Sequence, residues 1–279
     1  MGIDIFSARF LASERRRGVS FARLLTLGHQ SVYMDAGKYR AVLDSLKGAV
    51  KQTDYADDLF HALGATDMDV MDVSDYEGGT VIHDLNDPVA GSLHGKYDCV
   101  FDGGSLEHVF NFPVALKNCM EMVKVGGSFI TITPANNYCG HGFYQFSPEL
   151  FYTALSPLNG FKVERLLFAY RDQWYAPRTF EEVKARILLV TGEPVQIFVS
   201  ARRIEQKAIF QNWPQQPDYV QVWQEPGAQN AAPEKGMKET LVKMLPFVKA
   251  LQTRWRKSKE RRLSSPNNSA WFTRVELDE

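Results

Sequence analysis

The chain has 279 residues, of which 44% are hydrophobic and 23% are charged, a composition typical of a folded globular protein. Its formal net charge of −1 excludes a global electrostatic attraction to nucleic acid or anionic membrane, so any such contact must come from a local patch. No apolar run approaches the ~20 residues that a membrane-spanning helix needs, and the first residues lack the basic and apolar segments of a secretory signal.

The first part of the chain alternates short apolar runs with helical patterns. Leu24–Leu27 predicts a buried strand that Gly28 ends. Residues 36–63 have helical spacing and form a longer insertion than a simple crossover needs. Two short strands are predicted next, at Asp69–Val73 and Thr80–His83, separated by the turn-like SDYEGG.

The segment 97–134 predicts one complete strand–helix–strand unit. Its first strand is Tyr97–Phe101, its helix begins near Pro113 and ends at Gly126-Gly127, and its second strand is Ser128–Thr133. In an open α/β sheet, ligands bind just beyond the carboxyl ends of the strands. We therefore expect a small-molecule site in the turn after the first strand, which contains Asp102, Gly103, Gly104, Ser105, Glu107 and His108.

The second half continues the alternation of helices and strands. Ser147 is expected to cap a helix that starts at Pro148, and strands are predicted at Lys162–Ala169 and Pro194–Ala201 with a helix around Phe180–Leu189 between them. The whole pattern predicts an α/β fold with a doubly wound, mostly parallel, seven-stranded sheet and one antiparallel edge strand.

The composition changes after residue 204. Residues 205–236 are rich in Pro and Gln and predict a connector, and residues 237–279 predict a basic helical tail, interrupted at Pro246. The basic run Arg254–Arg262 is interpreted as a solvated helix end, with contact to a membrane surface, nucleic acid or a partner as the alternative. No transmembrane segment, no clear nucleic-acid partner and no particular oligomeric state are predicted.

Three cysteines occur in the chain: Cys99, Cys119 and Cys139. Their number is odd and their spacing does not match a metal site. The first two lie in predicted strand and helix interiors, where a thiol acts as a small apolar group. We expect a reducing, cytoplasmic environment.

The turn Leu106-Glu107-His108-Val109 and the segment Lys124-Val125-Gly126-Gly127 resemble those of class I S-adenosylmethionine-dependent methyltransferases. The resemblance covers roughly residues 20–204. It implies that residues 1–204 form a Rossmann-like methyltransferase domain, that residues 205–279 form a helical C-terminal extension, and that the cofactor is S-adenosyl-L-methionine.

The resemblance also implies the residues that bind the cofactor. Gly28 would approach its methionine part, Asp72 would accept hydrogen bonds from the ribose with Asp75 as the alternative, and Asp84-Leu85 would bind the adenine. Taken singly, each acid is equally well interpreted as a turn or helix cap. Their occurrence in strand order, each at a carboxyl end, favours binding. The turn after the fourth strand would lie beside the methionine moiety through Asp102, Gly103 and Gly104.

The candidate catalytic residues are His141, His108 and Glu107. Histidine is the side chain best suited to remove a proton near neutral pH, and His141 lies in a glycine- and aromatic-rich loop suited to an acceptor pocket. His29 and His83 are interpreted as structural. No set of His, Asp, Glu or Cys has the spacing of a dedicated metal site, so no metal is predicted.

The sequence thus predicts an enzyme, a methyltransferase that acts on a small-molecule or glycan-type acceptor, preferably on oxygen. The loop after the first strand has a single glycine and no acid, unlike the family's Gly-x-Gly-x-Gly loop. This favours an alternative, a non-catalytic protein that keeps the fold for binding or assembly. An NAD(P)-dependent oxidoreductase is a third and less favoured interpretation, because the Gly-x-Gly-x-x-Gly phosphate turn is missing.

Overall fold

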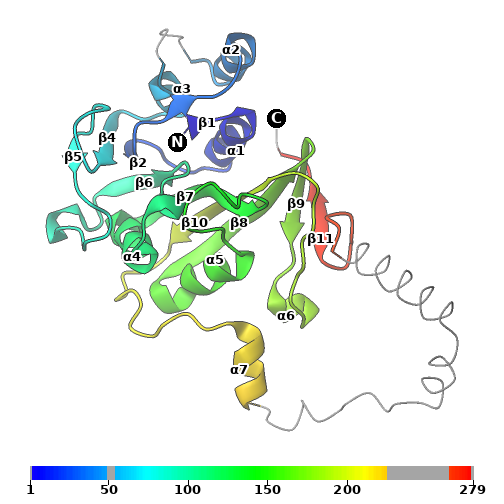
Figure 1. The fold of residues 1–279 in the computed structure, drawn as a ribbon. Helices are drawn as coiled ribbons and strands as arrows, with labels where there is room; N and C mark the ends of the chain where they lie inside the picture. The colour runs from blue at the N-terminus through cyan, green and yellow to red at the C-terminus, as the bar shows by residue number, and fades with distance from the viewer. Residues whose placement is uncertain (1, 49–53, 225–263, 278–279) are drawn as a thin grey trace, which may run out of the picture.

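The computed structural model describes residues 2–48, 54–224 and 264–277 of the protein. Within these residues, the strands of the main sheet are β2 (Arg23–Leu27), β4 (Asp67–Asp72), β5 (Val81–Ile82), β6 (Tyr97–Asp102), β7 (Val123–Asn136), β8 (Phe161–Tyr170), β9 (Gln173–Pro177), β10 (Val195–Arg203) and β11 (Phe272–Val275). They form one nine-stranded sheet in the order β11-β9-β8-β10-β7-β6-β2-β4-β5 (Figure 1). Two further strands, β1 (Gly2–Ile3) and β3 (Ser31–Val32), form a separate parallel pair.

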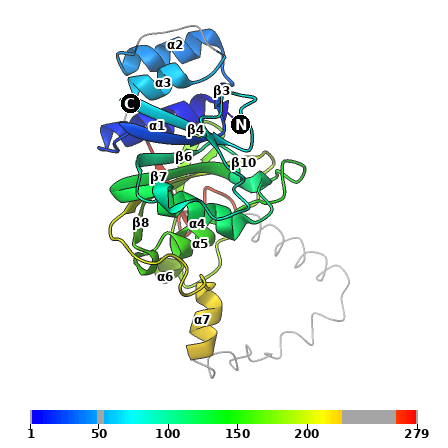
Figure 2. The ribbon, with the colours of Figure 1, turned by 90° about the vertical axis from the view of Figure 1, so that its left-hand side faces the viewer.

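Helices cover both faces of the sheet (Figure 2). The helices α1 (Ile5–Arg16), α2 (Ala36–Ser45) and α3 (Asp57–Ala62) lie on one face, and α4 (Phe112–Met122) and α5 (Pro148–Ala154) lie on the other. The shorter elements are α6 (Phe180–Val183), α7 (Pro217–Gln224) and the 3-10 turns η1 (Gly91–Leu93), η2 (Leu106–His108) and η3 (Pro157–Asn159).

The two faces of the sheet carry two separate apolar cores. Leu24 and Phe101 pack with the α1–α3 side, whereas their neighbours Leu25 and Val100 pack with the α4–α5 side. Successive side chains of a strand point to opposite faces, so a strand that is covered on both faces is apolar at every position. The prediction of an α/β, doubly wound sheet is confirmed. The sheet is mixed: the pairs among β7, β6, β2, β4 and β5 are parallel, and the pairs among β7, β10, β8, β9 and β11 are antiparallel.

The position of the antiparallel strand was predicted wrongly. β10 does not lie at an edge; it lies between β7 and β8 and pairs antiparallel with both. The sheet also continues beyond β8 into β9 and β11, so the predicted count of seven strands is too low.

The β8–β9 hairpin shows why β9 was missed. Its two-residue turn is Arg171-Asp172, with φ values of 49° and 57°, and it joins the paired residues Tyr170 and Gln173. Positive φ at both central residues is the mark of a type I′ turn, which the sequence usually signals by Asn-Gly or Asp-Gly. Arg-Asp gives no such signal.

The predicted end of the α4 helix is also wrong. The helix ends at Met122, and Val123 already pairs with Tyr97 in the sheet. Gly127 instead lies where the β6–β7 register shifts, and a Cβ there would lie 2.7 Å from the carbonyl oxygen of Asp98. The glycine is therefore needed for a close approach of two strands rather than for a helix stop.

Two other helices differ from the expectation. The helix predicted around Phe180–Leu189 is limited to Phe180–Val183, because Lys184 takes a left-handed conformation with φ of 49°. α1 was not predicted; Asp4 caps it by accepting a hydrogen bond from the backbone N–H of Ser7 at 2.8 Å.

The region beyond residue 204 is only partly described. The predicted connector contains α7, and most of the predicted basic tail, including Arg254–Arg262, lies outside the described residues. The described end of the tail forms β11, which pairs antiparallel with β9 through Phe272 and Pro177. That strand is part of the main sheet. None of the described helices is long and apolar enough to cross a membrane.

We predict that Phe272→Ala lowers the free energy of unfolding by about 3 kcal/mol, the usual cost of truncating a buried phenylalanine. Phe272 is 3% exposed, and its ring centroid lies 6.2 Å from that of Phe168. Thr273→Ala, at the neighbouring exposed position, should change stability by less than about 0.5 kcal/mol. Chemical denaturation measures both, and equal stabilities of the two variants would contradict the docking of β11.

Candidate functional site

A cavity of about 330 Å³ lies at the carboxyl edge of the parallel strands. The turns that follow β2, β4, β5 and β6 form its walls. The sequence-predicted residues Gly28, Asp72, Asp84 and Leu85 all line it, although they come from three different turns. The remaining lining residues are Leu27, Met71, Val73, His83, Asn86, Ser105, His108 and Val109.

The turn after β2 is closed by a side chain as well as by glycine. Gly28 has a φ of 70° and donates its N–H to the carbonyl of Met71 at 2.8 Å, which ties the turn to β4. Gln30 is 1% exposed, and its Nε2 donates to the carbonyls of Leu27 at 2.7 Å and Gly28 at 3.2 Å. A Cβ at Gly103 would clash with Gln30 Oε1. Gln30 therefore occupies the space between the turns after β2 and β6.

Two acids face the cavity from neighbouring turns. Asp72 accepts a hydrogen bond from the N–H of Val73 at 2.6 Å through Oδ1. Asp84 accepts from the backbone N–H and the side-chain Nδ2 of Asn86, at 2.9 and 2.7 Å, also through Oδ1, and these bonds lower the pKa of Asp84. The Asx-turn interpretation of Asp84 is therefore correct, and the same residue lines the cavity. Asp75 is not among the lining residues.

Asp102 lies behind the cavity wall and does not line it. It is fully buried; Oδ1 accepts from the N–H groups of Ser105 at 2.8 Å and Leu106 at 3.3 Å, and Oδ2 accepts from the hydroxyl of Thr131 at 2.7 Å. Burial raises the pKa of Asp102, while these hydrogen bonds act in the opposite direction. Gly103 and Gly104 are likewise absent from the lining, whereas Ser105 reaches it and donates its hydroxyl to the carbonyl of Leu27 at 2.8 Å.

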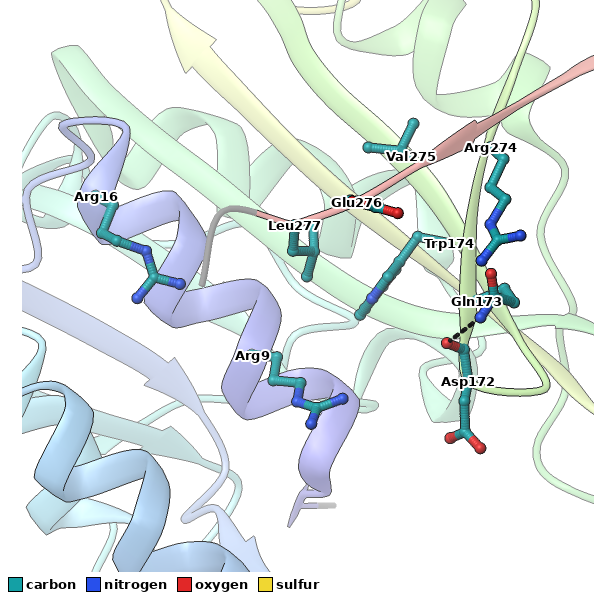
Figure 3. A pocket seen from close by; sticks show the side chains of 9 residues that line it. All are labelled: Arg9, Arg16, Asp172, Gln173, Trp174, Arg274, Val275, Glu276 and Leu277. Carbon is teal, nitrogen blue, oxygen red and sulfur yellow. Dashed lines mark hydrogen bonds between the residues drawn. The ribbon is translucent and has the colours of Figure 1, made fainter.

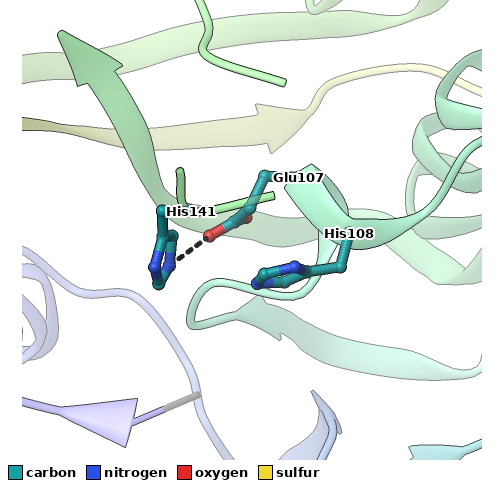
Figure 4. A group of neighbouring side chains, drawn as sticks. All are labelled: Glu107, His108 and His141. Atoms are coloured by element: carbon teal, nitrogen blue, oxygen red, sulfur yellow. Dashed lines mark ion pairs between the residues drawn. The ribbon is translucent and has the colours of Figure 1, made fainter. Parts of the chain in front are cut away.

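The three predicted catalytic residues lie together beside this cavity (Figure 4). Glu107 Oε1 is 3.6 Å from His141 Nε2, and the ring centroids of His108 and His141 are 5.2 Å apart. Burial, and second the charge of Asp102, raise the pKa of Glu107 to about 8. Burial, and second the charge of His141, lower the pKa of His108, which also lines the cavity.

Backbone contacts hold the His141 loop against Glu107. The carbonyl of Glu107 accepts the N–H groups of Phe143 at 2.8 Å and Tyr144 at 3.3 Å. Gly142, with a φ of 124°, passes so close that an added Cβ would lie 3.0 Å from the same carbonyl oxygen. The position of His141 relative to Glu107 is thus set by the backbone of both segments.

His29 and His83, which were predicted to be structural, both have contacts of that kind. The His29 ring stacks on Tyr55 with centroids 3.6 Å apart, and its Nε2 is 3.0 Å from Asp57 Oδ1. His83 Nε2 lies 2.9 Å from the carbonyl of Asp87, although His83 also contributes to the cavity lining.

A second cavity, of about 350 Å³, lies at the opposite end of the sheet (Figure 3). Arg9 and Arg16 from α1, Trp174 from β9 and Arg274 from β11 are among the residues that line it. None of the sequence-predicted site residues lies there, so the carboxyl edge is the candidate functional site.

No protein-family model and no curated protein matches the sequence. Solved structures resemble the chain in fold. An S-adenosylmethionine-dependent methyltransferase from Mesorhizobium loti is 14% identical, with a TM-score of 0.40 over 72% of this chain and 100% of that one. A geranyl diphosphate methyltransferase in complex with S-adenosylmethionine is 13% identical, with a TM-score of 0.40 over 71% and 85% of the two chains. A [4+2]-cyclase is 11% identical, with a TM-score of 0.41 over 71% and 80%.

One buried amide from α4 holds the wall of the cavity. Asn118 is 1% exposed; its Oδ1 accepts the N–H of Val89 at 3.0 Å, and its Nδ2 donates to the carbonyls of Asp87 at 2.8 Å and Leu85 at 3.3 Å. It therefore fixes the segment that carries Leu85.

We predict that Asn118→Ala lowers the free energy of unfolding by about 2 kcal/mol, because it leaves the buried N–H of Val89 without a partner. Lys117→Ala is the matched control on the same helix: its side chain is 43% exposed, so the change should stay within about 0.5 kcal/mol. Urea unfolding measures both. An equally small effect of the two substitutions would show that the Asn118 hydrogen bonds contribute nothing to the free energy of unfolding.

Proposed function

We propose that the protein is a class I S-adenosylmethionine-dependent methyltransferase that methylates a hydroxyl group of a small-molecule or glycan-type acceptor. The observation that carries the proposal is the cavity itself. Gly28, Asp72, Asp84 and Leu85 were singled out from separate positions in the sequence, and all line one space at the carboxyl edge of the sheet.

The walls of the cavity fit the nucleoside part of the cofactor. Asp72 and Asp84 each use Oδ1 for a local turn, and neither Oδ2 has a hydrogen bond to another described residue. A carboxylate oxygen of this kind accepts hydrogen bonds, so Asp72 would hold the ribose hydroxyls and Asp84 the adenine amine. Val73, Leu85 and Val109 supply apolar surface for the adenine ring.

The opposite wall fits the reacting end. When bound, S-adenosylmethionine supplies an electrophilic methyl group on a sulfonium. Ser105 and His108 line this wall. Glu107 directly precedes His108 in the chain, and its Oε1 lies 3.6 Å from His141 Nε2. An acceptor hydroxyl placed here has an imidazole within reach, and His141 is proposed to take its proton.

Aromatic side chains in the segments that carry His108 and His141 support an acceptor with flat or partly apolar faces, such as a sugar. Phe110 and Phe143 are 72% and 66% exposed, and their rings meet edge to face with centroids 5.9 Å apart. The ring centroid of Tyr138 lies 5.5 Å from that of His141. Large exposed aromatic groups are typical of binding surfaces.

A cytoplasmic location stays a prediction of the sequence.

A second function is favoured by one observation, the Gln30 side chain that fills the turn after β2. A filled turn leaves less room for the amino-acid end of the cofactor, as expected of a protein that keeps the fold for binding or assembly without catalysis. Titration calorimetry with S-adenosylhomocysteine separates the two functions. The methyltransferase should bind it with a micromolar dissociation constant, and the absence of binding would sink the enzymatic proposal.

We predict that Asp84→Asn weakens S-adenosylhomocysteine binding by about tenfold, because a charged hydrogen-bond acceptor contributes roughly 1.5–3 kcal/mol. Asparagine keeps an Oδ1 for the Asn86 turn, so the fold should be retained. Asp75→Asn is the control, since Asp75 is exposed and outside the lining. An affinity equal to that of the wild type would remove Asp84 from the cofactor site.

We predict that His141→Ala lowers the rate of methyl transfer by about 10²–10⁴-fold while S-adenosylhomocysteine affinity stays near the wild-type value. Cys139→Ala, an exposed position in the same loop, is the control and should keep the rate. The assay follows labelled methyl groups from S-adenosylmethionine into a panel of glycans and small hydroxyl compounds. A variant as fast as the wild type would exclude His141 as the residue that activates the acceptor.

A further inference from the structure

Glu107, His108 and His141 offer one carboxylate oxygen and two imidazole nitrogens to a common point. Their nearest ligand atoms all lie within 4.8 Å of one another (Figure 4). Two histidines and one carboxylate are a ligand set of catalytic zinc sites and of non-haem iron sites, which keep other positions open for water or substrate.

One oxygen of the Glu107 carboxylate has no hydrogen-bond partner among the described residues. Glu107 is 1% exposed, and this oxygen, Oε2, is buried. Buried polar atoms in folded proteins are nearly always paired, and an unpaired one calls for a specific explanation such as an ion. A cation bound beside Glu107 would compensate this buried carboxylate.

The spacing of the atoms suits a bound metal ion. With metal–ligand distances of about 2.1 Å, two ligand atoms in a tetrahedral shell lie about 3.4 Å apart. Glu107 Oε1 and His141 Nε2 are 3.6 Å apart. Both imidazoles are exposed, so rotation of their side chains can bring His108 to the same distance.

Backbone hydrogen bonds fix the segments that carry Glu107, His108 and His141. Glu107 and His108 belong to η2, whose turn is held by the buried Asp102, and His141 lies in the loop that is bonded to the carbonyl of Glu107. Close approach of Gly142 is part of this arrangement: a Cβ there would lie 3.2 Å from His108 Nδ1.

We propose that Glu107, His108 and His141 bind one divalent transition-metal ion, with its open positions facing the cofactor cavity. The chain pattern predicted no metal, because the His141 ligand lies far along the chain from the adjacent pair Glu107-His108. Only the fold brings the three together. Mixed imidazole and carboxylate ligation suits Zn²⁺, Fe²⁺, Co²⁺ or Mn²⁺ better than Ca²⁺, which takes oxygen ligands.

The role of the ion in methyl transfer rests on the proposed function, whereas its binding does not. His108 lines the cavity, so the ion would lie at the wall where the acceptor approaches. An acceptor hydroxyl bound at an open position loses its proton more easily: the O–H bond breaks, its electron pair stays on the oxygen, and the proton passes to water. In this form of the site, the ion replaces the His141 imidazole as the group that activates the acceptor.

Titration of the chelator-treated, full-length protein with Co²⁺ tests the proposal, by calorimetry and by the visible absorption of bound cobalt. The wild type should bind one equivalent. His141→Ala and Glu107→Gln should each weaken binding by about tenfold or more, since each removes a ligand. His94→Ala is the matched control, because His94 is 41% exposed and lies outside the cluster.

The outcomes separate the ion from the cofactor. Saturable binding that His141→Ala weakens and His94→Ala leaves unchanged supports the site. No saturable binding, or binding that is the same in all variants, overturns it. Each protein is also titrated with S-adenosylhomocysteine: if that ligand binds and Co²⁺ does not, the metal site fails and the methyltransferase proposal stands. If Co²⁺ binds at the cluster and S-adenosylhomocysteine does not, the metal site stands and the methyltransferase proposal fails.

Discussion

The candidate site depends on the buried carboxylate of Asp102. One of its oxygens accepts the N–H groups of Ser105 and Leu106, and the other accepts the hydroxyl of Thr131 on β7, so β6, β7 and the turn between β6 and α4 are joined at one point. That turn places Ser105 against the carbonyl of Leu27 and directs Glu107 toward His141. A buried carboxyl group is tolerated only with such hydrogen bonds. Asp102 therefore shapes the site without touching the cavity.

The turn after β2 is also held by a buried polar side chain. Gly28 and the buried amide of Gln30 form this turn, and the Gln30 amide donates to the carbonyls of Leu27 and Gly28. The amide also fills the space above Gly103, so that glycine is required by packing. The turns after β4 and β5 contribute two carboxylates to the cavity, whereas the space between the turns after β2 and β6 is filled by the Gln30 side chain. A ligand of this cavity must fit the two carboxylates and the filled turn alike.

The sequence predicted the part of the site that depends on strand order. Asp72, Asp84 and Leu85 follow successive strands, and parallel strands bring their carboxyl ends to one edge, so their meeting follows from the topology. Gln30 and Asn118 were not predicted, because their hydrogen bonds depend on the exact path of neighbouring turns. β9 and β11 were missed since a type I′ turn of Arg171-Asp172 and a pairing across a long segment leave no local pattern. The ligand set of Glu107, His108 and His141 likewise exists only in the fold.

A crystal structure of the full-length protein with S-adenosylhomocysteine tests the central claim most directly, because it locates both ends of the ligand. We expect the ribose at Asp72, the adenine beside Asp84 and Leu85, and the sulfur facing Ser105 and His108. A ligand bound in the arginine-lined cavity formed by α1, β9 and β11, or a carboxyl edge that stays empty at saturating ligand, would contradict it.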